Sequence, residues 1–467
     1  MPPEQAADDP NTDRKKLSQR LWRSFCRLQV RIFYHRFEAD GLEQLAAEGP
    51  VILAANHVNA LADAVVVQAA IPRPIRPIAR SGLFRNPLLV PILSVVQAVP
   101  IYRRPAEQAG EKAAGSNDES FAKLYELLAE GQVILIFPEG QSHSDPSLRP
   151  LKTGAARLAL GHLERTGQRV SVVPVGLVFT RKGRFRTGCL VKVGEPVEFQ
   201  EAAGESPEEA VRRYTDSILE GLQAVTLNAE SWQDVALLQH LQHFFALRSR
   251  RGDRPSLSQR FRSLQRLIED HRRLRSRWPG QVESLREKLE RFQSLCRRHG
   301  VRDYQLSLRY TPKLVTAFLA RHLSILLLVA PIALWGLLNS AIPYGLTRAA
   351  AALTAKGRDQ YDSARMLFGC LFFGLFWSAQ TAFVAWRFAP WPWAAAYALS
   401  LPLTSGLAFV LVQHRDRILE EARVFLLFMR RRELRVYLAD KRSELEVELA
   451  AMARLARRVH ERDGVES

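Results

Sequence analysis

The sequence contains few cysteines, and none of them stands in a pattern that carries chemistry. The four thiols are widely separated, with no Cys-x-x-Cys pair and no Cys/His cluster (Cys26, Cys189, Cys296 and Cys370). The pattern therefore supports neither a disulfide framework nor a zinc site, and a reduced compartment is the default expectation. No serine or cysteine lies in a nucleophile-elbow sequence, so a covalent enzyme intermediate is not indicated.

A secretory signal is also missing from the amino-terminal residues. Residues 1–16 contain Pro, Asp and Lys and no apolar core, whereas a signal peptide needs about 7–15 apolar residues in a row. We therefore expect the amino terminus to stay in the cytoplasm.

Acidic residues are outnumbered by basic ones. The chain carries 48 Asp and Glu against 66 Lys and Arg, which gives a formal net charge of +18. This charge favours anionic partners, namely nucleic acid, anionic lipid headgroups or phosphorylated substrates. The charge alone does not choose among them.

The length of 467 residues and the changes of pattern along the chain indicate at least two folded units. Residues 1–40 form a basic amphipathic segment that can lie on an anionic bilayer or pack on the adjacent domain, and the two interpretations have equal weight. Residues 41–232 alternate strand-like and helical runs, and residues 233–316 form an Arg-rich helical arm. Residues 317–412 are a membrane region of two to four spans, and residues 413–467 are a basic helical tail expected in the cytoplasm.

Within residues 41–232, short apolar runs alternate with helical patterns, which indicates an α/β domain. Strand-like runs cover residues 51–55, 75–79, 95–102, 133–137, 170–180 and 188–193, and helical patterns cover residues 61–70, 121–129 and 154–163. Residues 105–118 are polar and rich in Ala, Gly and Ser, which predicts a loop. A capping box from Ser206 to Glu209 predicts a helix that closes the domain.

Three apolar runs without charged residues follow, at residues 323–338, 367–386 and 394–412. The last two approach the length of about 20 residues that spans a bilayer, and Trp386, Trp391 and Trp393 between them are typical of an interfacial belt. A buried soluble hairpin is the less favoured interpretation.

The membrane topology conflicts with a simple count of these runs. Three spans would place the basic tail opposite the basic amino-terminal domain, against the positive-inside tendency. Pro331, Pro343 and Gly345 interrupt the first apolar segment. We therefore hypothesise that residues 323–355 form a re-entrant or short paired hairpin that returns the chain to the cytoplasm.

A histidine and a carboxylate follow the first predicted strand. His57 lies in the loop behind that strand, and Asp63 lies in the first turn of the next helix, where the helix dipole favours an ionised carboxylate. Since helical side chains lean toward the amino terminus, Asp63 can reach back to one imidazole nitrogen and leave the other free as a general base. Such a base suits deprotonation of a substrate alcohol. A His/Asp pair also arises by chance, so other residues must support it.

Candidate substrate-binding residues follow other predicted strands. Arg80 and Arg103 come after strand-like runs, and Lys152 precedes a helix. Guanidinium groups and helix starts bind phosphate, although each of these cations taken singly is more often a surface charge. Glu139 can hold a substrate hydroxyl or fix a neighbouring Arg, and Gly140 shapes its turn.

At these residues the chain resembles the phospholipid/glycerol acyltransferase family, the glycerol-3-phosphate and lysophosphatidate acyltransferases. Four blocks in the family's order carry the resemblance: residues 56–63, 82–103, 137–142 and 172–176. The commonest family pattern has four residues between His and Asp, whereas this chain has five. The form His-x-Asn-x-x-x-Asp, with Phe-Pro-Glu-Gly-x-Ser-His-Ser and Leu-Lys-Thr-Gly, resembles the branch that acylates glycerol 3-phosphate or dihydroxyacetone phosphate.

The resemblance implies transfer of a fatty acyl group from a thioester, on coenzyme A or acyl carrier protein, to a hydroxyl of glycerol 3-phosphate or dihydroxyacetone phosphate. Lysophosphatidate is the alternative acceptor. His57 is implied as the general base and Asp63 as its orienting partner. Contacts with substrate are implied for a further set of residues: Asn56, Asn59, Arg80, Arg103, Glu139, Gly140, Ser142, Lys152 and Pro174. No metal or other cofactor is implied, because a thioester is already an activated donor.

The expected architecture is an α/β acyltransferase domain, with a mixed sheet flanked by helices, followed by a helical arm and C-terminal transmembrane helices. We expect an integral membrane protein of phospholipid biosynthesis with membrane lipids as partners and its catalytic domain on the cytoplasmic face. Two rival functions remain. Nucleic-acid binding would use the positive charge, but no binding motif is present and apolar spans argue against it. A non-catalytic membrane scaffold would use the helical arm and the tail as interaction surfaces.

Overall fold

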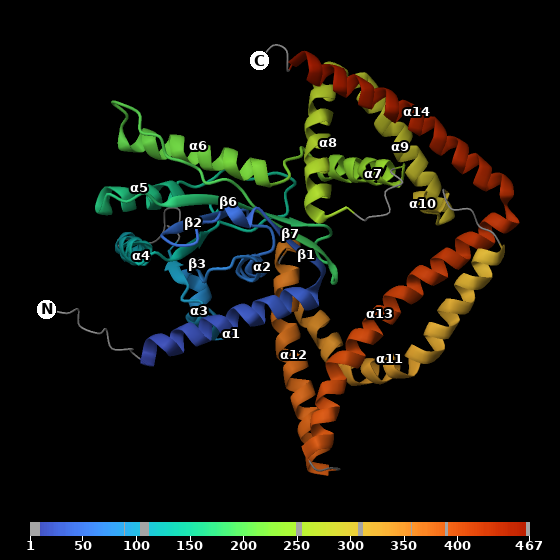
Figure 1. The fold of residues 1–467 in the computed structure, drawn as a ribbon, viewed down its shortest axis with the longest axis horizontal. Helices are drawn as coiled ribbons and strands as arrows, with labels where there is room; N and C mark the ends of the chain where they lie inside the picture. The colour runs from blue at the N-terminus through green and yellow to red at the C-terminus, as the bar shows by residue number, and fades with distance from the viewer. Residues whose placement is uncertain are drawn as a thin grey trace. The chain divides into compact units, whose positions relative to one another are not determined.

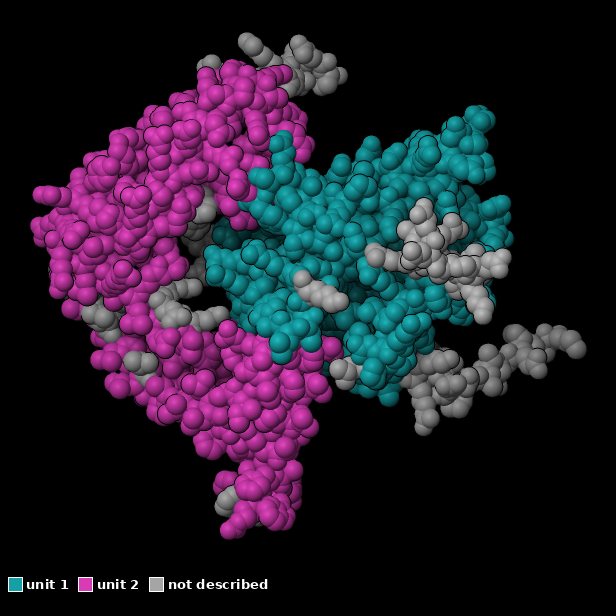
Figure 2. Space-filling view, turned by 180° about the vertical axis from the view of Figure 1, so that it is seen from behind, with its two compact units in different colours: residues 1–232, 255–261, 351–366 teal, residues 233–254, 262–350, 367–467 magenta. Residues whose placement is uncertain are grey.

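The computed structural model describes residues 10–87, 89–102, 112–248, 255–306, 312–355, 357–387 and 391–463. The chain divides into two compact units (Figure 2). Unit 1 comprises residues 1–232, 255–261 and 351–366, and unit 2 comprises residues 233–254, 262–350 and 367–467. Unit 1 contains a mixed sheet, and the described part of unit 2 consists of helices.

Unit 1 is organised around a seven-stranded sheet (Figure 1). The strands lie in the order β1 (Tyr34–Asp40), β7 (Thr187–Val193), β6 (Ser171–Phe179), β2 (Val51–Ala55), β5 (Val133–Ile136), β3 (Ile75–Arg80) and β4 (Val99–Ile101). Neighbouring strands run parallel, except that β6 and β7 are antiparallel. The predicted α/β domain with a mixed sheet flanked by helices is therefore confirmed.

The central strands are apolar on both faces because both faces are covered by helices. In β2, Val51, Leu53 and Ala55 belong to one core cluster, whereas Ile52 and Ala54 belong to the other. All five side chains are fully buried. The alternation of β2 between two cores explains why its sequence is an unbroken apolar run.

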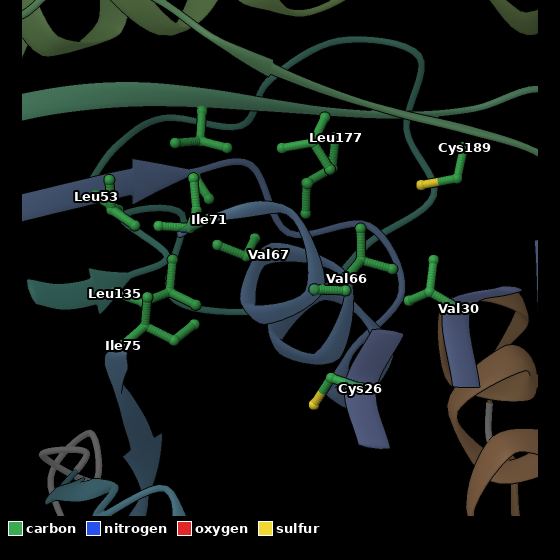
Figure 3. Close-up of a cluster of buried hydrophobic side chains, with 14 of the residues drawn as sticks. Cys26, Val30, Leu53, Val66, Val67, Ile71, Ile75, Leu135, Leu177 and Cys189 are labelled. Carbon is green, nitrogen blue, oxygen red and sulfur yellow. The ribbon is translucent and has the colours of Figure 1, made fainter. Parts of the chain in front are cut away.

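Helices form a layer on each face of the sheet (Figure 1). α1 (Pro10–Phe33) and α2 (Leu61–Ala70) pack on the first cluster, where Cys26 and Val30 of α1 lie near Val66 of α2 (Figure 3). The second cluster is covered by α4 (Lys112–Ala129), α5 (Gly154–Thr166) and α6 (Pro207–Val225). Three short elements complete unit 1: η1 (Leu42–Gln44), η2 (Ser81–Arg85) and α3 (Val90–Val95).

The amphipathic helix α1 uses one face for packing and leaves another face outside. Cys26, Val30 and Phe33 are buried against the domain. An apolar stripe at helical spacing is exposed: Leu17, Leu21, Phe25, Leu28 and Ile32. Packing on the domain and an outward apolar face thus coexist in the same helix.

One sequence prediction in unit 1 needs correction. Residues 105–118 are predicted as a loop, yet α4 already begins at Lys112. Strong helix formers at the start of this segment, Lys112, Ala113 and Ala114, extend the amphipathic helix that ends at Ala129. Residues 105–111 lie outside the described residues.

Long helices make up the rest of the chain. The predicted helical arm contains α7 (Trp232–Arg248), α8 (Leu257–Arg277), α9 (Pro279–His299) and α10 (Asp303–Leu306). They are followed by α11 (Pro312–Thr354), α12 (Arg358–Arg387), α13 (Trp391–Arg430) and α14 (Arg432–Asp463). A core in unit 2 joins Leu289 and Phe292 of α9 to Val424 of α13 and Leu438 of α14.

Three helices are long and apolar enough to cross a membrane, at Leu327–Thr354, Arg358–Arg387 and Trp391–Val412. Small and polar side chains join them in unit 2, which is typical of membrane helices. Tyr397 donates a 2.7 Å hydrogen bond to the Oδ1 atom of Asn339, and Ser340 pairs with Ser405 at 2.5 Å. The expected C-terminal transmembrane helices are therefore present as candidates by length and composition.

The first of these helices corrects the hairpin hypothesis. α11 is one continuous helix, so the chain does not reverse within residues 323–355. Pro331 and Pro343 lie inside it, and the carbonyl groups that proline leaves unpaired can be satisfied by neighbouring helices and side chains in such apolar segments. The number of times the chain crosses a bilayer stays a prediction.

Candidate active site

The candidate site lies at the carboxyl ends of neighbouring parallel strands in unit 1. β2 pairs with both β5 and β6, and ligand sites in open α/β sheets form at this edge. The loop after β2 carries His57, and the turn after β5 carries Glu139. Two hydrogen bonds join the two segments: the His57 N–H donates to Oε1 of Glu139 at 2.9 Å, and the His143 N–H donates to the His57 carbonyl at 3.0 Å.

His57 and Asp63 are in direct contact. The Nδ1 atom of His57 lies 2.9 Å from Oδ2 of Asp63, whose side chain is fully buried. Because an ionised carboxylate only accepts hydrogen bonds, the proton of the neutral imidazole lies on Nδ1. Nε2 makes no hydrogen bond to the described residues, and 18% of the His57 side chain is exposed. The imidazole can therefore accept a proton at Nε2 from a bound ligand.

The imidazole ring is also held by an aromatic contact. It stacks on Phe137, the last residue before the turn that carries Glu139, with ring centroids 4.0 Å apart and an interplanar angle of 16°. Stacking fixes the plane of the ring while the Asp63 bond fixes its rotation. Together they direct Nε2 to one place.

The loop between His57 and Asp63 contains a strained residue. Ala60 has φ 48° and ψ −126°, a conformation that only glycine adopts without steric conflict. Strain of this kind costs about 1–3 kcal/mol and persists where surrounding contacts enforce it. Here Oδ2 of Asp63 accepts two further hydrogen bonds, both 2.7 Å, from the N–H groups of Val58 and Asn59. The five-residue spacing thus forms a loop wrapped around one carboxylate oxygen.

Glu139 is buried and bonded on all sides by protein groups. Its carboxylate accepts hydrogen bonds from the N–H groups of His57 and Arg149, each 2.9 Å long, and contacts Nε2 of His143. None of its side chain is exposed. Gly140, with φ 73°, continues the turn, and a Cβ there would lie within 2.9 Å of the Lys152 side chain. Glu139 therefore serves to join the two loops of the site.

Several residues predicted to contact substrate are engaged with the protein itself. The amide of Asn56 accepts from and donates to the backbone of Leu177, and Ser142 donates to Oδ2 of Asp359 at 2.5 Å. Pro174 packs against Gly194 and against Gly221 of α6. The Asn59 side chain is fully buried and finds no hydrogen-bond partner among the described residues. The contact of these residues with substrate stays a prediction.

The predicted cations lie at three different places. Arg80 is exposed at the end of β3, and Lys152 is exposed beside Gly140. Arg103 lies outside the described residues. Among the described residues, no group of three or more His, Cys, Asp or Glu side chains is arranged to hold a metal ion.

Lys182 is a buried cation that sequence reasoning did not select. It lies in the turn between β6 and β7, with Nζ 5.6 Å from the centre of the Trp232 ring and without a hydrogen-bond partner in the described part of the chain. Burial lowers the pKa of its ammonium group, and nearby carboxylates, Asp63 foremost, oppose that shift. The only sequence signal was the basic character of residues 181–186.

The contacts that His143 and the start of α12 make in the site were not predicted from the sequence. His143 joins Glu139 to the chain that follows it, since its Nδ1 accepts a 3.1 Å hydrogen bond from the N–H of Asp145. Its position four residues after Glu139 was the available signal. Asp359, Asp362 and Ser363, at the start of α12, touch the loops of the site. No sequence pattern marks them.

Part of the chain is similar to known proteins. The acyltransferase family model matches residues 36–178. Glycerol-3-phosphate O-acyltransferase 1 of Saccharomyces cerevisiae is 33% identical over 143 residues, which is 29% of this chain and 19% of that protein. A chloroplastic 1-acyl-sn-glycerol-3-phosphate acyltransferase of Arabidopsis thaliana is 27% identical over 164 residues, which is 35% of this chain and 40% of that protein.

Similarity to one relative extends further along the chain. An uncharacterised acyltransferase of Schizosaccharomyces pombe is 24% identical over 336 residues, which is 66% of this chain and 48% of that protein. The chain spans less than half the length of each of these relatives. The matched domain contains His57, Asp63 and Glu139, whereas Lys182 and α12 lie beyond it.

Replacing Glu139 by Gln should destabilise unit 1. An amide nitrogen would face at least one of the donors that now share the carboxylate, and leaving a buried donor unpaired costs about 1–3 kcal/mol. We expect a lower thermal midpoint for Glu139→Gln in the purified full chain. Glu126→Gln is the control, because Glu126 is an exposed residue that pairs with Lys123 on the surface. Equal midpoints for the two variants would contradict this role of Glu139.

Proposed function

We propose that the chain transfers a fatty acyl group from an acyl thioester to a hydroxyl of glycerol 3-phosphate or dihydroxyacetone phosphate, and the match of residues 36–178 to the acyltransferase family model supports the class of reaction. The observation that carries the proposal is the imidazole of His57, bonded at Nδ1 by Asp63 and open at Nε2. The similarity to a glycerol-3-phosphate O-acyltransferase supports the choice of acceptor.

The proposed reaction uses this geometry. The acceptor hydroxyl gives its proton to Nε2 of His57 as its oxygen attacks the thioester carbonyl carbon. Asp63 stabilises the imidazolium that forms, and a general base so placed contributes about 10²- to 10⁴-fold in rate. When the tetrahedral intermediate collapses, the C–S bond breaks and the thiol leaves with the proton from Nε2. His57 is then neutral again.

The acyl donor is a thioester on coenzyme A or on acyl carrier protein. A thioester is reactive enough that direct attack by the acceptor suffices, so no cofactor and no acyl-enzyme enter the mechanism. Both the donor and the reaction product carry a fatty chain. The product leaves into membrane lipid.

Membrane attachment supports a reaction at the bilayer surface. Three helices of the chain are candidate spans, and α1 exposes an apolar stripe among its basic residues. Lys and Arg side chains near an anionic bilayer contribute about 1 kcal/mol each, and the net charge of +18 has the sign for this. We propose that the catalytic domain lies on the cytoplasmic face of the membrane.

Lysophosphatidate is the second candidate acceptor. Relatives named as 1-acyl-sn-glycerol-3-phosphate acyltransferases align with 35% of this chain. Lysophosphatidate presents the same phosphate and a free hydroxyl, so the same base would act on it.

Direct comparison of acceptors tests the proposed function. The purified full chain in lipid vesicles is offered glycerol 3-phosphate, dihydroxyacetone phosphate and lysophosphatidate separately with one acyl-CoA, and products are identified by mass spectrometry. We expect acylated glycerol 3-phosphate or dihydroxyacetone phosphate. Diacylated product from lysophosphatidate alone would transfer the assignment to the second candidate. Failure with every acceptor, with acyl carrier protein as well as coenzyme A, would refute it.

His57→Ala should lower the transfer rate by at least about 10²-fold, because the general base is removed. The protein should still fold, since the His57 ring is partly exposed. The measurements are product formation and the thermal midpoint. His35→Ala, at an exposed histidine of β1, is the matched control and should keep its activity. Full activity of His57→Ala would be incompatible with the mechanism.

Asp63→Asn removes the negative charge of the side chain and keeps its shape. All three hydrogen bonds of Asp63 go to Oδ2, so an asparagine can keep them with its oxygen and put its amide nitrogen at the Oδ1 position. The fold should persist while the imidazolium loses its anionic partner. We expect kcat to fall by about 10²-fold or more and KM for the acceptor to change little. A change confined to KM would count against this role.

A further inference from the structure

The first turns of α12 belong to unit 1 and lie against the loops of the candidate site. Unit 1 includes residues 351–366, although they follow the acyltransferase domain by more than a hundred residues in sequence. Met366 is buried in the same core cluster as β2 and α2, and Asp362 and Ser363 are also buried. The contacts that this segment makes are specific and polar.

Ser363 holds the loop that carries His57. Its hydroxyl accepts a 2.8 Å hydrogen bond from the N–H of Ala62 and donates to the carbonyl of Asn59. These two groups lie on either side of Ala60, the residue with φ 48°. An N-cap side chain usually accepts from the N–H two or three positions on, but Ala60 at the N-cap of α2 has no side-chain oxygen. Ser363 supplies the missing cap from 301 residues away.

The same helix start contacts the two other loops of the site. Asp359 accepts the hydrogen bond from Ser142, in the turn after β5. Asp362 accepts a 3.0 Å hydrogen bond from the N–H of Gly183, in the turn after β6, and Arg365 donates to the carbonyl of Gly183 at 3.3 Å. Three segments that follow three neighbouring strands are thus bonded to residues in the first turns of one helix.

We propose that residues 359–363 are a positioning element of the active site, with Ser363 as the residue that fixes the His57–Asp63 loop in its strained form. The inference rests on the proposed function for its kinetic consequence. α12 continues over residues 367–387, which at about 1.5 Å per residue is enough to cross about 30 Å of hydrocarbon core. The helix that enters the bilayer therefore also sets the geometry of the general base.

Ser363→Ala tests the proposal through two independent readouts in the full chain. Hydrogen–deuterium exchange of a peptide covering residues 57–63 should become faster, because the cap on Ala62 is lost. In the transfer assay, kcat should fall about tenfold, the equivalent of one lost hydrogen bond. KM for the acceptor should stay within about twofold, because Ser363 acts through the loop and touches no substrate.

Ser340→Ala is the matched control. Ser340 is a serine in α11 with the same exposed fraction as Ser363, 7%, and its hydroxyl is likewise bonded to a residue distant in sequence, Ser405. Its removal should leave exchange of residues 57–63 and kcat unchanged. Equal effects of the two variants would mean a general loss of stability and would overturn the proposal.

A second variant tests the role of strain. Glycine adopts the backbone conformation of Ala60 without steric conflict, so Ala60→Gly in the Ser363→Ala background should recover a large part of kcat and of the exchange protection. No recovery would overturn the assignment of Ser363 to the strained loop.

The exchange readout separates this inference from the proposed function. Unchanged exchange of residues 57–63 in Ser363→Ala would refute the positioning role even in an active enzyme. If the wild-type protein acylates none of the acceptors, the proposed function fails, while faster exchange would still establish the contact between α12 and the loop.

Discussion

A single buried carboxylate oxygen organises the candidate site. Oδ2 of Asp63 accepts the His57 ring N–H and two backbone N–H groups. A buried carboxylate is costly unless donors surround it, so the loop after β2 must bend around this oxygen. Loop shape, imidazole tautomer and the open Nε2 atom are therefore three consequences of one buried charge. The strained backbone of Ala60 is a consequence of this bending.

The strands that lead into the loops of the site could be predicted from sequence. The position of these loops at one edge of the sheet could be predicted as well. β2 and β5 are apolar runs that end in polar turns, and parallel strands bring such turns to one edge. The contact of His57 with Asp63 follows from the position of Asp63 in the first turn of a helix. Local pattern was sufficient for these features because each depends on residues close together in sequence or on strand direction.

Side-chain roles were harder to predict than positions. Asn56 and Glu139 are predicted substrate ligands and both bond to protein groups in the fold, because a polar residue in a turn can serve either purpose; their contact with substrate stays a prediction. Ser363 could not be predicted, since its partners are about three hundred residues away and it begins a run that reads as a membrane helix. α11 is continuous through two prolines, whereas the sequence pattern of local helix breakers predicted a reversal there.

The inward orientation of the carboxylates makes the site compatible with the anionic acceptor that we propose. Asp63 and Glu139 are fully buried, and their hydrogen bonds go to internal donors. Lys152 is exposed at the end of the loop that follows β5, and Arg80 is exposed at the end of β3. Two like charges at 4 Å repel by about 1 kcal/mol in water and by about 4 kcal/mol near a protein surface, so outward carboxylates would exclude a phosphate. Because both carboxylates are turned inward, the exposed cations can attract the phosphate of the proposed acceptor, while the carboxylates hold the ring and the backbone N–H of His57.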